Sequence, residues 1–380
     1  DLHSFPTRRS SDLHIALPMS AILLRTGYRN GMALGLGIMA IGALLHIPAA
    51  YTASFPVFLL GLFVLGTGLT ILQTASNPYI VLLGPIESAA MRISIMGIVN
   101  KMAGVIVPLV FTALILSDVG DPAALATSAI SATELAALAA RMVVPYLSMA
   151  LVLLALAALV WFAPLPPMEP AEGEGSTDGY GSILHFPNVV LGALTLFAYM
   201  GLEVLAGDTI GLFGSSLGVA AFATLTSYTM AFMVLGYLIG VCFIPHYLSQ
   251  RAALIASGIA GLLAVIGTLV SSPQSSAIAR MLWGYSGIPT VPDPVFFVAF
   301  MGMAHALVWP TVWPLALQGL GRFTAKGSAL LVMSISGGAL IPLLFGRLAG
   351  STGNVQFSYW LAAPCSIWRS EERRVGKECR

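Results

Sequence analysis

The chain is predicted to be an all-α integral membrane protein, and three observations indicate this fold class. Hydrophobic residues make up 57% of its 380 residues, charged residues make up only 9%, and the mean hydropathy is +0.90. A soluble domain usually carries about 25% charged residues. Several stretches, residues 31–66 among them, run without a charge for longer than the roughly 18 residues that cross a bilayer as a helix. A soluble core does not explain so many such stretches.

The two ends of the chain do not fit this pattern. The C-terminal stretch RSEERRVGKEC can be encoded by a DNA string whose reverse complement, read one base in, encodes HSFPTRRSSD near the N-terminus. That string resembles a common short-read sequencing adapter. We therefore interpret residues 1–13 and 369–380 as adapter-derived, exclude them as one excludes a fusion scar, and expect the rest to be a fragment cut at both ends.

Removal of these ends leaves ten Lys and Arg against eleven Asp and Glu, so the net charge changes from +1 to −1. No basic patch for nucleic acid remains, and the lipid bilayer is an expected partner. Cys242 and Cys365 lack the paired spacing of a metal site or a disulfide framework.

Apolar spans separated by glycine, proline or charge predict the membrane helices in order. They are 14–24, 31–51, 55–83, 93–117, 142–163, 188–207, 220–244, 252–271, 295–316, 327–347 and 354–368. Residues 164–187 are rich in Pro and Gly and acidic, which is typical of a solvent-exposed linker. They divide the chain into an N-terminal half, 14–163, and a C-terminal half, 188–368.

An internal repeat supports this division. RISIMGIVNKMAGVIVPLVF (92–111) and KGSALLVMSISGGALIPLLF (326–345) align without a gap. The matching helix is fifth of six in the second half but fourth of five in the first. We therefore expect two six-helix halves, helices 2–6 and 7–12, with the first helix missing and the last truncated. Parallel six-helix repeats describe the major facilitator architecture.

The distribution of Lys and Arg predicts the orientation. One set of connections holds six of these residues and the other holds three, which places the first set and the 164–187 linker in the cytoplasm. A polar side chain at membrane depth is costly and therefore needs a reason. These polar positions supply the candidate functional residues.

The stretch ILQTASNPYI (71–80) interrupts an apolar run with amides. Gln73 and Asn77 lie four apart on one helix face, and Pro78 removes a backbone donor and loosens the helix near residue 74. Together they can present amides to a sugar-sized, hydroxyl-rich ligand. The alternative is helix–helix adhesion, which such residues often provide.

Charged and aromatic residues give the other candidates. Asn100 is predicted to contact the ligand. Lys101 is predicted to face the cavity or to pair with an acid. Arg92 is expected to mark the membrane surface and to have a gating or structural role. Glu203, expected in the outer half of its span, and Asp208, expected near the surface, are candidates for proton coupling; the alternative for Glu203 is a structural role in the outer vestibule. Trp309 could stack on a sugar ring or belong to an interfacial belt.

No nucleophile elbow, zinc-binding helix or phosphate loop is present in the sequence, so an enzyme, a metal site and an organic cofactor are not expected. The coupling ion is expected to be a proton, with Na⁺ as the variant.

The stretch LQTASNPYIVLLGPIESAAMRISIMGIVNK (72–101) resembles the fucose–galactose–glucose:proton symporters of the major facilitator superfamily, and is closest to their bacterial glucose/galactose branch. The resemblance extends over nearly all of 14–365, with YMGLEVLAGDT (199–209) and VWPTVWPLALQGLG (308–321) as further matches. It implies alternating access, with a sugar bound between the halves, in a monomeric, multi-pass protein of the bacterial inner membrane.

The resemblance also implies residue roles. The fourth-helix glutamate of the fucose permease corresponds to Gln73, whose amide cannot carry a titrating proton, and its sugar-binding fifth-helix asparagine corresponds to Asn100. We therefore expect a proton-coupled hexose importer, with glucose or galactose as the expected substrate and fucose as a further candidate. The alternatives are Na⁺ coupling, a non-transporting sensor or scaffold of the same fold, and drug efflux, which the amides disfavour.

Overall fold

The computed structural model describes residues 13–52, 54–116, 132–166, 183–219, 222–244 and 246–367. Within these ranges every regular element is a helix, and nine helices are long and apolar enough to cross a membrane. The span Arg141–Phe162 is the clearest, because only 6% of its most apolar window is buried inside the protein. An apolar helix that the protein itself does not cover requires lipid around it. Residues 1–12, 369–380 and most of the predicted linker lie outside the described ranges.

The helices fall into two compact units. Unit 1 contains 1–79, 106–177 and 321–332, and unit 2 contains 80–105, 178–320 and 333–380. The units therefore do not follow the two predicted halves at two places. Residues 80–105, which include the start of the first repeat helix, belong to unit 2, which is formed mainly by the C-terminal half. Residues 321–332, which include the start of the second repeat helix, belong to unit 1, which is formed mainly by the N-terminal half. The predicted halves themselves remain a prediction.

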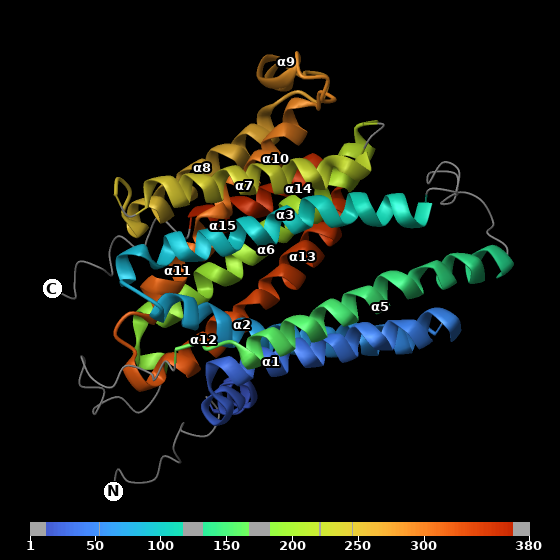
Figure 1. The fold of residues 1–380 in the computed structure, drawn as a ribbon. Helices are drawn as coiled ribbons and strands as arrows, with labels where there is room; N and C mark the ends of the chain where they lie inside the picture. The colour runs from blue at the N-terminus through green and yellow to red at the C-terminus, as the bar shows by residue number, and fades with distance from the viewer. Residues whose placement is uncertain are drawn as a thin grey trace, which may run out of the picture. The chain divides into compact units, whose positions relative to one another are not determined.

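Unit 1 is built mainly from three long helices: α1 (Leu13–Thr52), α2 (Phe55–Leu82) and α5 (Ala132–Phe162). In Figure 1, α1 and α5 run side by side. α1 contains two helical segments, because Gly27 has φ 73° and ψ 171°, outside the helical region. Glycine allows the close approach of α1 to α2: a Cβ on Gly35 would lie 2.8 Å from the Gly68 carbonyl oxygen. The short α12 (Thr324–Met333) begins in this unit.

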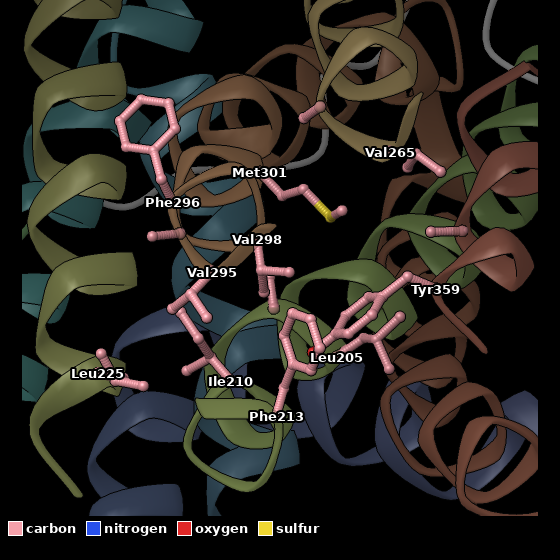
Figure 2. Packing of buried hydrophobic residues seen from close by; sticks show 14 of the residues in the cluster. Leu205, Ile210, Phe213, Leu225, Val265, Val295, Phe296, Val298, Met301 and Tyr359 are labelled. Atoms are coloured by element: carbon pink, nitrogen blue, oxygen red, sulfur yellow. The ribbon is translucent and has the colours of Figure 1, made fainter. Parts of the chain in front are cut away.

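Unit 2 contains the first part of α3 and most of the helices that follow the linker. They are α3 (Ala89–Leu116), α6 (Pro187–Ser216), α7 (Leu225–Phe243), α8 (Gln250–Val270), α9 (Ala277–Trp283), α10 (Asp293–Ala306), α11 (Val308–Leu317), α13 (Gly337–Thr352), α14 (Val355–Ser358) and α15 (Ala362–Ile367). Figure 2 shows part of the apolar core between them. Phe213 of α6 packs on Tyr359, with ring centroids 5.2 Å apart, and Leu205 and Ile210 lie on the same α6 face. This apolar face fixes the direction in which the polar residues of α6 point.

The structure changes several predicted spans. The predicted helix 295–316 is divided at Leu307 into α10 and α11, in agreement with the irregular helix that Pro310 and Pro314 predict. The predicted helix 188–207 continues to Ser216, because Asp208 and Thr209 stay within α6. The last predicted span, 354–368, is divided into α14, a 3₁₀ turn and α15. By contrast, α2 continues through Pro78 without interruption.

Arg92, predicted to mark the surface, ties the end of α2 to the start of α3. Its guanidinium donates hydrogen bonds to the carbonyls of Ile80 (3.0 Å) and Val81 (2.9 Å), to those of Gly84 (3.2 Å) and Pro85 (3.1 Å), and to the hydroxyl of Ser88 (2.6 Å). The last carbonyls of a helix lack hydrogen-bond donors within the helix, and the guanidinium of Arg92 supplies such donors at the end of α2. Its structural role is thereby explained by the turn that it holds.

Replacing Arg92 by alanine is expected to destabilise the protein, since one hydrogen bond to a charged group contributes about 1.5–3 kcal/mol and several are lost together. A lower thermal midpoint in detergent, measured by fluorescence scanning, would show this. The matched control is Arg347→Ala, because Arg347 of α13 is exposed. Equal midpoints for the two variants would contradict the assigned role.

Candidate functional site

In unit 1, α2 holds a group of buried amide atoms. The side chain of Asn77 is 1% exposed, and both its Oδ1 and its Nδ2 have no hydrogen-bond partner among the described residues. The Oε1 atom of Gln73, one turn earlier, is also buried without such a partner. A buried amide without partners costs free energy, so native structures rarely retain one without a function. These atoms are therefore candidates for binding a hydroxyl-rich ligand.

The neighbouring residues of α2 show that this is not a general property of its polar side chains. Thr74 and Thr70 are also polar, but the hydroxyl of each donates to the carbonyl four residues earlier, at 2.7 Å and 2.8 Å. Thr74 is as buried as Asn77. Pro78 has no N–H, so the carbonyl four residues before it, at Thr74, receives no helical hydrogen bond from residue 78. On α2 the threonine hydroxyls thus have hydrogen-bond partners, whereas the amide atoms of Asn77 and the Oε1 of Gln73 have none among the described residues.

Two residues of α1, in the same unit, also carry buried polar atoms and were not found from the sequence. The hydroxyl of Tyr28 and the Oδ1 of Asn30 are buried without a hydrogen-bond partner among the described residues. Tyr28 lies beside Tyr79 of α2, with ring centroids 6.0 Å apart. The sequence signal was the glycine at position 27, because glycine readily adopts the positive φ that the structure shows there, just before these residues. The adjacent Arg25 and Arg29 concealed it, since they indicate a surface connection.

In unit 2, the two charged residues predicted separately at membrane depth form one ion pair. The ammonium of Lys101 on α3 contacts the Glu203 carboxylate on α6, and each side chain is 13% exposed. Lys101 lies twelve residues after Ala89, or about 18 Å along α3, far from either helix end. Pairing an acid with a base lowers the cost of holding both in the membrane interior.

In the structure Glu203 lies near the middle of α6, because α6 continues nine residues beyond the predicted end at 207. Its place in the outer half of the membrane span stays a prediction. Asp208 lies within α6 rather than at its end, and its side chain is exposed. Asp208 interacts electrostatically with both Glu203 and Lys101. Lys101 therefore contacts Glu203 and lies within electrostatic range of Asp208.

Aromatic residues extend this charged group towards α11. The buried Tyr199 phenol, one turn before Glu203 on α6, is an electrostatic neighbour of both Glu203 and Tyr237. Trp309 lies beside Tyr199, with ring centroids 6.3 Å apart, and beside Trp313 at 5.5 Å. Trp309 is half-buried, and Trp313 is fully buried with its Nε1 lacking a hydrogen-bond partner among the described residues. Trp309 thus lies one aromatic ring away from the ion pair.

The structure therefore brings together Lys101, Glu203, Asp208 and Trp309 in unit 2, while Gln73 and Asn77 lie in unit 1. Asn100, also in unit 2, has an exposed side chain beside Lys101. Within the described part of the chain, no three His, Cys, Asp or Glu side chains gather as metal ligands would.

These features define the class of protein as a polytopic helical membrane protein, and comparison with solved structures gives it the major facilitator fold. The outward conformation of the fucose transporter FucP matches the structure with a TM-score of 0.76 at 20% identity, over 97% of this chain and 89% of that one. A proton:xylose symporter, XylE, matches at 0.56 and 14% identity, over 93% and 84%. At these identities, the similarity supports the fold.

Relatives by sequence identify the family. The glucose/galactose transporter of Brucella abortus biovar 1 (strain 9-941) is 32% identical over 341 residues, 89% of this chain and 76% of the relative. The L-fucose-proton symporter of Escherichia coli (strain K12) is 26% identical over 373 residues, 92% and 79%. The chain belongs to this family of sugar transporters in the major facilitator superfamily. No protein-family profile matches it.

Proposed function

We propose that the protein imports a hexose, glucose or galactose, across the bacterial inner membrane in symport with a proton, as a monomer. One observation carries the substrate class: both amide atoms of Asn77, the Oε1 of Gln73 and the Oδ1 of Asn30 are buried without a hydrogen-bond partner in the part of the chain that the structure describes. Sugar hydroxyls both donate and accept hydrogen bonds, so they satisfy an amide oxygen and an amide nitrogen together. The names of the relatives, a glucose/galactose transporter and an L-fucose-proton symporter, agree with this class.

The coupling ion follows from the position of the acids. Gln73 cannot take up a proton, since an amide does not titrate in this range. Glu203 lies at mid-helix beside Lys101, and Asp208 lies five residues further along α6. A carboxylate held at this depth by a cation can exchange a proton when that contact changes. We assign the coupling role to Glu203, with Asp208 as the second candidate.

Uptake of labelled glucose and galactose by the full-length protein in proteoliposomes tests this function. Accumulation is expected when the outside is acidic, and it should collapse when a protonophore is added. Accumulation that follows a Na⁺ gradient at equal pH would replace the proton by Na⁺. Absence of uptake and of counterflow for either sugar, in vesicles where the protein is shown to be folded, would reject the transport function.

A further inference from the structure

Four contacts along the first part of α3, all within unit 2, form what we call the α3 seam. Ser94 lies against Gly240 of α7, Gly97 against Tyr237, Gly104 against Met230, and Lys101 against Glu203 of α6. A Cβ on Gly97 would lie 2.7 Å from the Tyr237 ring, and one on Gly240 would lie 2.8 Å from the Ser94 hydroxyl oxygen. Close approach through glycine is typical of helix contacts in membranes.

The seam joins helices from opposite halves of the chain. α3 belongs to the predicted N-terminal half, whereas α6 and α7 belong to the predicted C-terminal half. At the start of α3, Gln250 of α8 donates from its Nε2 to the carbonyls of Ile86 (2.8 Å) and Glu87 (3.1 Å). Rigid-body rocking of one half against the other underlies alternating access. Contacts of α3 with α6 and α7 must therefore change during transport.

Of the four contacts that define the α3 seam, the Lys101–Glu203 pair is the one between charged side chains. The other three contacts involve glycine, and van der Waals contacts of this kind separate with little directional penalty. The groups that face Glu203 are Lys101 from α3, Tyr237 from α7, and Tyr199 and Asp208 from α6. Trp309 of α11 faces Tyr199 and carries no charge at neutral pH.

We propose that the Lys101–Glu203 pair is an ionic lock between the two halves, and that protonation of Glu203 releases it. This inference rests on the proposed proton-coupled transport. A proton adds to a carboxylate oxygen of Glu203, the carboxyl group becomes neutral, and its ionic contact with Lys101 is lost. Lys101 keeps its charge, and Asp208 is the acid that can then pair with it. Lys101 is thus a positioning residue that converts proton binding into separation of the α3 seam.

A disulfide across the seam measures this separation. The Cβ of Ser94 and a Cβ built at Gly240 are 3.5 Å apart, within the range that a disulfide requires. The pair Ser94→Cys and Gly240→Cys is introduced after Cys242 and Cys365 have been replaced by serine. The matched control is Gly31→Cys with Ala75→Cys, because those Cβ atoms are also 3.5 Å apart but join α1 and α2 of one half.

The seam disulfide is expected to stop sugar counterflow, and reduction should restore it. Glu203→Gln, which mimics the protonated acid, should slow formation of the seam disulfide by roughly fivefold or more, without changing the control pair. In a Lys101→Met background, Glu203→Gln should have no further effect, since the lock is already lost. The doubly neutral protein leaves neither member of the Lys101–Glu203 pair as an isolated charge, so it also provides a folded reference.

Three results would overturn the ionic lock: counterflow that persists in the cross-linked protein, an equal effect of Glu203→Gln with and without Lys101, or equal slowing of the control pair. Proton-driven uptake by the protein that carries the two seam cysteines, measured in the same vesicles before oxidation, separates this from the proposed function. Loss of that uptake would reject the symport itself, whereas normal uptake with an unaltered seam would reject only the lock.

Discussion

Glu203→Gln is expected to abolish accumulation of sugar in a pH gradient while sparing counterflow. Glutamine has nearly the shape of glutamate and can still accept a hydrogen bond from Lys101, but it cannot carry a proton. The sugar then equilibrates across the membrane without being concentrated. Because exchange of labelled for unlabelled sugar requires no net proton movement, counterflow reports an intact binding site. Both rates can be measured in one preparation of proteoliposomes.

The matched control is Glu87→Gln, because Glu87 is an exposed acid in the turn between α2 and α3. This variant should accumulate sugar normally. Asp208→Asn separates the two acids of α6: if it uncouples transport and Glu203→Gln does not, the coupling role belongs to Asp208. Unchanged accumulation in the Glu203→Gln variant rejects the role of Glu203 directly.

The membrane helices could be predicted because their signal is local. Apolar length alone placed α2, α7 and α8 to within a few residues at most ends. The end of α6 was missed for a physical reason: Asp208 and Thr209 look like a surface connection. In the structure, Thr209 lies within the helix and shares a hydrogen bond of 2.8 Å with Tyr359. A polar pair inside a helix cannot be recognised without its distant partner.

The candidate site shows the same division between local and tertiary information. Lys101 and Glu203 each stood out in the sequence as charges at membrane depth, and Lys101 was predicted to face the cavity or to pair with an acid. Their contact spans 102 positions of the chain, so only packing of α3 on α6 could select this acid. Tyr28 and Asn30 remained hidden for the opposite reason. They lie among arginines near a helix start, where polar residues are ordinary, and only their burial marks them.

Asn77→Leu is expected to abolish sugar binding and, at the same time, to stabilise the sugar-free protein. Leucine is close to asparagine in size, and it removes two buried polar atoms that have no hydrogen-bond partner among the residues the structure describes. Each such group costs about 1–3 kcal/mol when buried and unpaired. The thermal midpoint of the sugar-free variant should therefore rise. The further rise that sugar causes in the parent protein, which corresponds to about 2.7 kcal/mol at a hundred times the Kd, should disappear.

Thr74→Val provides the matched control for this experiment, since Thr74 is equally buried on α2 but already donates to the Thr70 carbonyl at 2.7 Å. It should keep the sugar-dependent shift. The two explanations of the α2 amides predict opposite signs. If Asn77 holds helices together, its replacement removes a stabilising contact, so the sugar-free midpoint falls and the response to sugar survives. If Asn77 holds sugar, stability is gained and the response is lost, because the unpaired amide is retained for the ligand.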